Sequence, residues 1–263
     1  MAVIPARYAS NRFPGKVLAA RTGRYLVQHV YESVRQAARV DRVIVATDDQ
    51  RVMDAVASFG GEARMTRPDH PSGTDRVAEV AAELDDGVDV ILNVQGDEPE
   101  IDPGHVDRLV ELLGDRETCV MATLACPFPE EADPTDPNCV KVVLDQCGRA
   151  LYFSRSLIPF VRCDRPARTA GGRWLLHMGI YAYRRAFLST LAGLTPTPLE
   201  KVERLEQLRV LEHGYELAVG VVDRAPAGID TPEEYEAFVR RATQLGGCRT
   251  QAPGAMPKRS AGM

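Results

Sequence analysis

The chain has 263 residues, of which 44% are hydrophobic and 26% are charged, so it can bury a full core in one large or two unequal domains. Its formal charge of −5 is spread along the sequence with no basic block beyond Lys258-Arg259, which argues against nucleic acid as a main partner. The residues before Arg7 are too few for a signal peptide, and no window approaches about 18 uninterrupted apolar residues. We therefore expect a soluble, cytoplasmic protein without membrane insertion, and we expect its six cysteines, which form no CxxC pair, to be reduced.

The first half of the chain alternates short β-branched segments with helical patterns, which is typical of a parallel sheet covered by helices on both faces. The first predicted helix follows from Leu26, Val30 and Val34, which recur every four residues. Strands are predicted at residues 3–4, 42–46, 62–66 and 88–94. Helices are predicted at residues 25–38, 51–59, 74–84 and 103–113.

From Cys119 onward the pattern changes, because strands follow one another with little helix between them. These strands are predicted at residues 119–125, 140–144 and 151–154, and another begins at His177. They favour an antiparallel excursion at roughly residues 126–195. An amphipathic helix over 198–213, a strand at 217–222 and a helix over 231–242 complete the pattern. We expect a single domain over residues 1–245 and a disordered tail over 246–263, which lacks periodicity.

A loop directly after the first strand carries Arg7, Arg12 and Lys16 together with Gly15. Backbone amides, arginine forks and a lysine ammonium are the groups that bind phosphate oxygens, so the loop suits a triphosphate, although a solvated basic turn would have the same composition. Val17 after Gly15-Lys16 excludes a Walker A loop, and no strand is followed by GxGxxG.

Two acidic positions suit a magnesium ion. Asp97 follows the buried strand at 88–94, and ligands of open parallel sheets bind at that carboxyl edge. Its neighbour Glu98 is expected to turn elsewhere, and the Gly-Asp pair could instead be a simple turn. Asp230 directly precedes Thr231, the predicted N-cap of the last helix, and it could either bind a metal or belong to the capping box.

Two further segments suit substrate binding. Ser72, Thr74 and Arg76 open a helix, whose amino terminus favours anions, so they could contact a base or its phosphates, or could simply cap the helix. Arg155 ends one strand and His177 begins another. A lone histidine is more often a structural hydrogen-bonding residue than a catalyst, so we assign His177 to substrate binding.

Nine segments in order resemble the 3-deoxy-manno-octulosonate (Kdo) cytidylyltransferase family. They are IPARYAS (4–10), FPGK (13–16), IVATD (44–48), SGTDR (72–76), NVQGDEP (93–99), ALYFSR (150–155), HMGIY (177–181), PLE (198–200) and LEQLRVL (205–211). The resemblance runs from about Val3 to Tyr235. It departs in two places, because family members often carry a few apolar residues before the first strand and the tail after Thr243 has no recognised counterpart.

The resemblance implies a Rossmann-like nucleotide-diphospho-sugar transferase fold, an α/β fold with a mostly parallel central sheet, a smaller antiparallel dimerisation subdomain and a homodimer. It implies a magnesium-dependent transfer of the CMP group of CTP to the anomeric hydroxyl of Kdo, giving CMP-Kdo and pyrophosphate for lipopolysaccharide biosynthesis. By the same resemblance, Arg7, Arg12 and Lys16 would hold the CTP phosphates, Ser72 and Arg76 would lie near the nucleotide, and Asp97 and Asp230 would bind Mg²⁺. The sugar acid would be surrounded by Gln95, Arg155, His177, Tyr181, Glu206 and Gln207, with Arg155 as a partner of its carboxylate.

The expected reaction is an in-line attack on the α-phosphorus without a covalent enzyme intermediate, driven by alignment and charge neutralisation through Arg7, Lys16 and Asp97. Three alternatives stay open. A cytidylyltransferase for amino-Kdo or a sialic-acid-like sugar would differ in its acceptor. A glycosyltransferase of similar fold would usually carry Asp-x-Asp, where this chain has Gly96-Asp97-Glu98. A noncatalytic regulator would bind CTP without turnover.

Overall fold

The computed structural model describes residues 1–9, 13–84, 87–129, 132–162 and 174–248. The strands are β1 (Ala2–Pro5), β2 (Val43–Thr47), β3 (Ala63–Met65), β4 (Val90–Asn93), β5 (Cys119–Pro127), β6 (Lys141–Leu144), β7 (Ala150–Ser154), β8 (Leu175–Arg184) and β9 (Glu216–Val221). The helices are the short 3-10 helix η1 (Lys16–Leu18), α1 (Leu26–Val34), α2 (Gln50–Ser58), α3 (Gly73–Ala82), α4 (Pro103–Gly114), α5 (Arg185–Gly193), α6 (Pro198–Glu203), α7 (Gln207–Glu212) and α8 (Pro232–Cys248).

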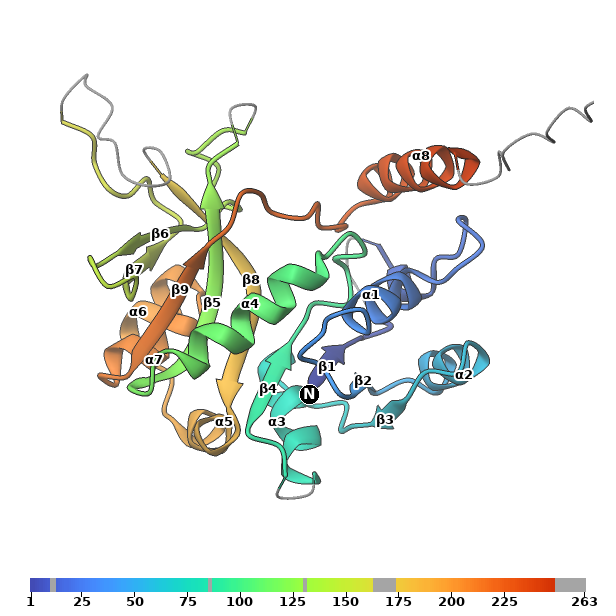
Figure 1. Ribbon diagram of the computed structural model, residues 1–263, viewed down its shortest axis with the longest axis horizontal. Helices are drawn as coiled ribbons and strands as arrows, with labels where there is room; N and C mark the ends of the chain where they lie inside the picture. Colours follow the sequence, from blue (N-terminus) through green and yellow to red (C-terminus); the bar gives the residue numbers. More distant parts are fainter. Residues whose placement is uncertain (10–12, 85–86, 130–131, 163–173, 249–263) are drawn as a thin grey trace, which may run out of the picture.

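One sheet runs through the described chain in the order β3-β2-β1-β4-β8-β5-β9, and β6 and β7 branch off beside β8 (Figure 1). Strands β3, β2, β1 and β4 are parallel, as the alternating pattern predicts. Strand β8 enters antiparallel to both β4 and β5, while β9 returns parallel to β5. The pairings among β6, β7 and β8 are antiparallel and lie where the excursion is predicted.

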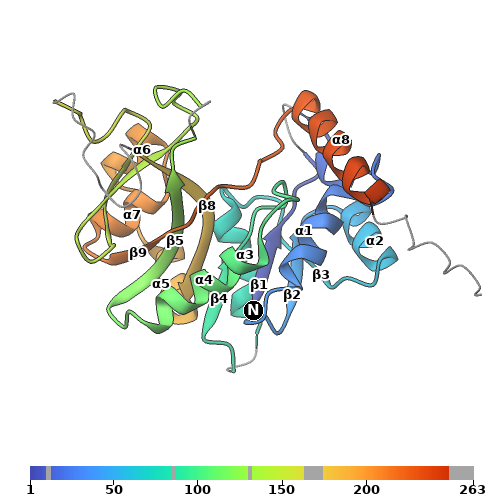
Figure 2. The ribbon, with the colours of Figure 1, turned by 45° about the horizontal axis from the view of Figure 1, so that its top comes forward.

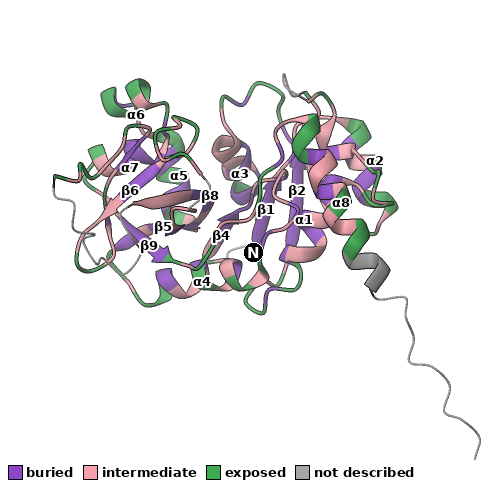
Figure 3. Cartoon of the chain, turned by 90° about the horizontal axis from the view of Figure 1, so that it is seen from above, coloured by how far each residue is buried: buried purple, intermediate pink, exposed green. Residues whose placement is uncertain are grey.

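Side chains alternate across the sheet between two apolar clusters. Ile4 and Leu92 face the side covered by α1, α2 and α4, whereas Val3 and Ile91 face α3, α5 and α7. The sheet is therefore buried between two layers of helices, as Figure 3 shows by the buried strands between partly exposed helices. In the described chain no helix combines the length and apolar character that a membrane crossing would need.

The C-terminal helix α8 packs beside α1 (Figure 2), away from the branch formed by β6 and β7 that Figure 1 labels. Ile229, Tyr235 and Phe238 form a small apolar cluster with Leu26 at the start of α1. The Tyr235 hydroxyl also accepts a hydrogen bond from the Arg21 backbone amide at 2.8 Å. Helix α8 continues to Cys248, past the predicted end at residue 242 and past the predicted start of the tail, and residues 249–263 lie outside the described residues.

The single helix predicted over residues 198–213 is wrong, because the structure divides it into α6 and α7. Arg204 between them has φ 53° and ψ 50°, a left-handed conformation that ends α6. No glycine or proline marks this break. The side chain of Arg155 donates instead to the carbonyls of Glu203 at 2.8 Å and Arg204 at 3.4 Å, so a tertiary contact takes acceptors that a continuous helix would use.

Candidate active site

Two adjoining cavities open at the carboxyl ends of β1 and β4, the edge where the acidic segment was predicted. The outer cavity has a volume of about 400 Å³, and the inner cavity one of about 120 Å³. Gly73 and Gln95 line both of them, so the two cavities adjoin at these residues. The other residues of the outer cavity are Pro5, Arg7, Ala9, Lys16, Val17, Gly96, Asp97 and Asp230.

The loop after β1 is closed by its own backbone, since the Gly15 amide donates to the Tyr8 carbonyl at 3.0 Å. Gly15 has φ +70°, and a Cβ at this position would lie 3.1 Å from the Tyr8 ring. A residue outside the loop also holds it in place, because the Arg51 guanidinium lies 3.4 Å from the centroid of the Tyr8 ring. These contacts fix the positions of Arg7 and Lys16 at the two ends of the loop.

We expect Gly15→Ala to destabilise the protein by about 1 to 2 kcal/mol, because alanine is strained in the left-handed region and crowds Tyr8. Chemical denaturation measures the change. Gly114→Ala is the control, since Gly114 ends α4 with open space around it, and this variant should be neutral or slightly stabilising. Equal effects of the two substitutions would show that the Gly15 conformation is not strained.

The ammonium of Lys16 lies between the two predicted metal ligands. Its Nζ is 2.6 Å from Asp97 Oδ2 and 2.9 Å from Asp230 Oδ1, and it also donates to the Ile229 carbonyl at 3.0 Å. Burial lowers the pKa of Lys16, but the two carboxylates outweigh burial and the net pKa is raised. The amide of Ile229 donates to the Asp97 carbonyl at 2.9 Å, so the backbone itself joins the loop after β4 to the segment before α8.

These residues fit a magnesium ion. Asp97 and Asp230 supply two carboxylates to one position, and Mg²⁺ is usually held by one or two carboxylates with phosphate oxygens and water completing its shell. No group of three His, Cys, Asp or Glu side chains suited to a metal occurs among the residues that the structure describes. Glu98 does not line the outer cavity, and its Oε2 is buried without a hydrogen-bond partner. Burial, followed by the nearby Asp97 charge, raises the pKa of Glu98 to about 8.

Arg7 also faces the outer cavity, where its guanidinium donates to the His70 carbonyl at 2.5 Å. Arg12, predicted to bind the phosphates with Arg7 and Lys16, lies outside the described residues. The described part of the loop therefore brings two cations to the cavity that Asp97 and Asp230 line from other segments. Such a wall is suited to a polyphosphate that arrives with a divalent cation.

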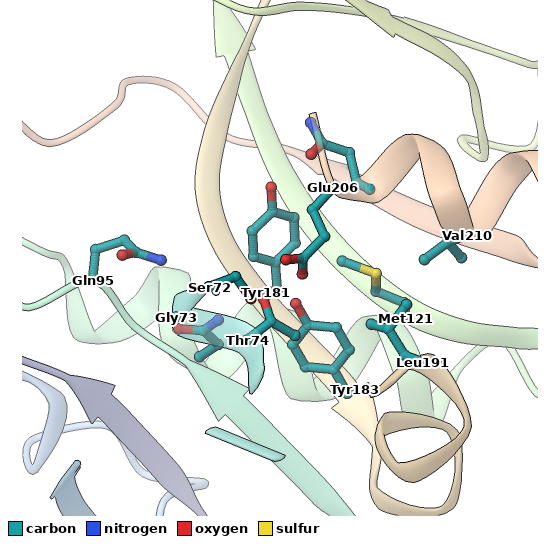
Figure 4. Close-up of a pocket in the computed structure, with 12 residues that line it drawn as sticks. Ser72, Gly73, Thr74, Gln95, Met121, Tyr181, Tyr183, Leu191, Glu206 and Val210 are labelled. Carbon is teal, nitrogen blue, oxygen red and sulfur yellow. The ribbon is translucent and has the colours of Figure 1, made fainter. Parts of the chain in front are cut away.

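The inner cavity is lined mainly by hydroxyl, amide and carboxyl groups above an apolar floor. Figure 4 shows the Glu206 side chain reaching from the start of α7 toward Tyr183, with Gln95 at the opposite side. The remaining lining residues are Ser72, Thr74, Asn93, Met121, Tyr181, Leu191, Gln207 and Val210. Gln207 is only 4% exposed, and its Nε2 has no hydrogen-bond partner, so a donor is left to be satisfied there. Burial raises the pKa of Glu206, and hydrogen bonds with Thr74 and Ser72 partly offset the rise.

The comparisons with known proteins decide the family. The cytidylyltransferase family model matches residues 1–217. The 3-deoxy-manno-octulosonate cytidylyltransferase of Syntrophobacter fumaroxidans is 52% identical over 241 residues, covering 90% of this chain and 94% of the relative. That of Syntrophotalea carbinolica is also 52% identical, covering 89% and 94%. The chain belongs to the family of 3-deoxy-manno-octulosonate cytidylyltransferases.

Solved structures agree with this cytidylyltransferase assignment. A structure of CMP:2-keto-3-deoxy-manno-octonic acid synthetase complexed with CTP matches with a TM-score of 0.85 and 43% identity, covering 93% of this chain and 98% of that chain. A 4-diphosphocytidyl-2C-methyl-D-erythritol synthase from Anaerococcus prevotii matches with a TM-score of 0.59 at 13% identity, which shows the shared fold alone. The predicted α/β fold with a mostly parallel central sheet is confirmed.

Two predicted contacts of this cytidylyltransferase lie away from both cavities. Arg76 is fully buried and donates to Asp48 at 3.0 Å and to the Thr66 hydroxyl, so its guanidinium joins α3 to the neighbouring ends of β2 and β3. Arg155 donates to the carbonyls of Pro137, Glu203 and Arg204. In this arrangement Arg155 supports the α6–α7 junction beside Glu206, whereas the predicted contact with a sugar carboxylate would need its guanidinium to leave these carbonyls.

His177 stands behind the inner cavity of the cytidylyltransferase and does not line it. Its Nε2 forms a 3.0 Å hydrogen bond with the Thr123 hydroxyl, and its ring centroid lies 4.9 Å from that of Phe153 and 5.6 Å from that of Tyr181. Burial lowers the pKa of His177 to about 3, so the imidazole is neutral at pH 7. The predicted binding role is therefore indirect in this geometry, because His177 touches Tyr181, which does line the cavity.

We expect His177 to make the protein sensitive to acid. Above pH 6.5 the imidazole is neutral in both the folded and the unfolded chain. Below pH 6.5 the imidazole of the unfolded chain binds a proton, whereas that of the folded protein binds one only near pH 3. Stability is thus lost as the pH falls from 6.5 toward 3. Denaturation at pH 7 and pH 4 should show that His177→Asn loses about 2 to 3 kcal/mol less over this range than the wild type. His213→Asn, which removes an exposed histidine, should match the wild type.

Sequence reasoning missed Tyr183, Asn93 and Met121, which line the inner cavity. Tyr183 could have been found from strand periodicity, because residues two apart on β8 share a face and Tyr181 was already a candidate. Asn93 at the end of β4 and Gln95 just after it are also two residues apart, which suggests that their side chains lie on the same side of the chain. Met121 carries no such signal, since an apolar residue in a buried strand is usually part of the core.

Proposed function

We propose that the protein transfers the CMP group of CTP to the anomeric hydroxyl of Kdo, giving CMP-Kdo and pyrophosphate for lipopolysaccharide biosynthesis. The observation that carries the proposal is that two unlike cavities adjoin. The outer one presents Arg7, Lys16, Asp97 and Asp230, whereas the inner one presents hydroxyl, amide and carboxyl groups, and none of the described residues that line it is an arginine or a lysine. A triphosphate suits the first and a polyhydroxylated sugar the second, so the acceptor hydroxyl and the α-phosphorus would meet near Gly73 and Gln95.

The side chains of the outer cavity would act by binding and neutralising phosphate charge. Arg7 would exchange its hydrogen bond to the His70 carbonyl for one to a phosphate oxygen. The Lys16 ammonium would likewise exchange its hydrogen bond to Asp97 for one to a phosphate oxygen. Asp97 and Asp230 would hold Mg²⁺, which supplies charge neutralisation and orientation of phosphate oxygens when bound. In the transfer the anomeric oxygen forms a bond to the α-phosphorus, the bond from that phosphorus to the pyrophosphate oxygen breaks, and the hydroxyl proton passes to water.

The inner cavity would hold the hydroxyl groups of the sugar. Glu206 and Gln95 offer acceptors, and Gln207 offers the unsatisfied donor that a sugar oxygen would take. Because Glu206 is acidic, the carboxylate of the sugar acid is expected to point away from it, toward the cationic outer cavity. This polarity would orient the anomeric carbon toward the nucleotide.

The test is release of pyrophosphate from CTP by the purified protein with Mg²⁺ and a panel of acceptors. Kdo should be the best acceptor, with amino-Kdo and sialic acids giving lower kcat/KM. A better rate with either of these would support the alternative acceptor. CTP binding without pyrophosphate release on any acceptor would contradict the enzyme assignment.

We further propose that the protein works as a homodimer in the cytoplasm. The antiparallel excursion exposes large apolar side chains, with Leu151 60% and Phe160 85% accessible, and contact with a second copy would cover them. Cys119, Cys126, Cys139 and Cys147 are unbridged in the described chain, which fits a reducing compartment, while Cys163 and the Cys248 side chain fall outside the description. Sedimentation velocity tests the dimer, which a species of one chain's mass at micromolar concentration would contradict.

A further inference from the structure

The ammonium of Lys16 has as many acceptors as it has protons. Asp97, Asp230 and the Ile229 carbonyl lie 2.6, 2.9 and 3.0 Å from Nζ, and the side chain is only 12% exposed. A lysine ammonium donates three hydrogen bonds, so this one is saturated by the protein itself. It lies at the position between two carboxylates where a divalent cation would bind them both.

Lys16 and a metal ion cannot hold this position together. Two carboxylates at one point repel each other, and the ammonium leaves the trio with one net negative charge. A divalent ion that approached Asp97 and Asp230 in this state would meet a cation a few ångströms away, and the repulsion between the two cations would weaken its binding. Metal uptake therefore requires the ammonium to leave first.

The outer cavity offers the Lys16 ammonium a second binding position. Its flexible stem carries the ammonium on four methylene groups, and the same side chain lines the cavity that the triphosphate would fill. Phosphate oxygens there would replace the three protein acceptors. Arg7 lines the same cavity but touches neither carboxylate in the described structure, because its guanidinium donates to His70.

Building on the proposed function, we propose that Lys16 is the resident counter-ion of Asp97 and Asp230 in the nucleotide-free protein, and that the pair accepts a divalent cation only after a triphosphate has drawn the ammonium away. Nucleotide and metal then bind cooperatively. By thermodynamic linkage each raises the affinity for the other by the same factor. Before the nucleotide arrives, Lys16 also joins the β1 loop to the segments that carry the two carboxylates.

The experiment measures Mn²⁺ binding by electron paramagnetic resonance of the free ion, without sugar acid and without turnover. In the absence of nucleotide, Lys16→Gln should bind Mn²⁺ at least about tenfold more tightly than the wild type, because the competing cation is gone. With CTP present the wild type should gain more affinity than the variant. Arg7→Gln is the matched control, since it removes the same charge from the same cavity without touching the pair.

Three results would overturn the proposal. Unchanged Mn²⁺ affinity in Lys16→Gln would show that the ammonium does not compete, and an equal gain in Arg7→Gln would show a general charge effect. A gain that persists in Lys16→Gln/Asp97→Asn would place the ion elsewhere. Lys16→Met, which keeps the length of the stem, repeats the measurement if the glutamine variant fails to fold by thermal denaturation. A failure of the pyrophosphate assay would leave these Mn²⁺ results unaffected, so the two proposals fail separately.

Discussion

Asp97→Asn is expected to lower kcat by about 100- to 1000-fold at saturating Mg²⁺, while the Kd for CTP changes much less. Asparagine keeps the size of the side chain but removes one of the two carboxylates that meet at Lys16. The loss should appear mainly in turnover, because charge neutralisation matters most when the bond to pyrophosphate breaks. Initial rates at saturating CTP and Kdo, with calorimetric CTP binding, separate the two quantities.

The control for Asp97→Asn is Asp54→Asn, since Asp54 is an exposed residue of α2 that bonds Gln50 and lines neither cavity. It should turn over like the wild type. Near-wild-type turnover in Asp97→Asn would show that the Asp97 carboxylate does not take part in the chemistry. An equal loss in both variants would point to a general effect of surface charge.

Glu206→Gln is expected to lower kcat/KM for the sugar acid by about 100-fold, with KM for CTP changed by less than about threefold. Glu206 is half-buried, reaches into the inner cavity and carries hydrogen bonds with Thr74 and Ser72. Glutamine fills the same space but replaces an acceptor oxygen with a donor, so a sugar hydroxyl and the threonine hydroxyl cannot both be satisfied. Kinetics with each substrate varied in turn measures the effect.

Glu83→Gln serves as the comparison for Glu206→Gln, because Glu83 is an exposed residue at the far end of α3 from Ser72. It should leave both KM values unchanged. A loss in Glu206→Gln that falls on CTP and not on the sugar acid would assign the inner cavity to the nucleotide. That outcome would reverse the two cavities in the proposed mechanism.

Much of the fold could be predicted, because local patterns coincide with tertiary structure in the parallel half of the sheet. Continuous apolar runs such as residues 43–46 have buried side chains on both faces, so pattern and burial agree. Asp97 and Lys16 were found for the same reason, since both follow strands that end at one edge. That Asp230 joins them was expected from the family resemblance and not from periodicity.

The features that the sequence did not reveal depend on contacts between distant segments. The break at Arg204 carries no local signal, because it depends on Arg155 reaching two carbonyls across the fold. Arg76 would be expected at a helix start near solvent, yet Asp48 and Thr66 give its charge buried partners. Helix α5 was missed as well, since it follows β8 without a side-chain cap.

The family model ends at residue 217, but Asp230 and α8 come after it. The helix is anchored mainly by Tyr235 and Phe238 against Leu26, outside the two clusters that bury the sheet. During synthesis, therefore, the last strand of the sheet leaves the ribosome before Asp230 and α8 do. A cut in the segment before α8 would therefore separate Asp230 from Asp97 and Lys16 while leaving every strand of the sheet intact.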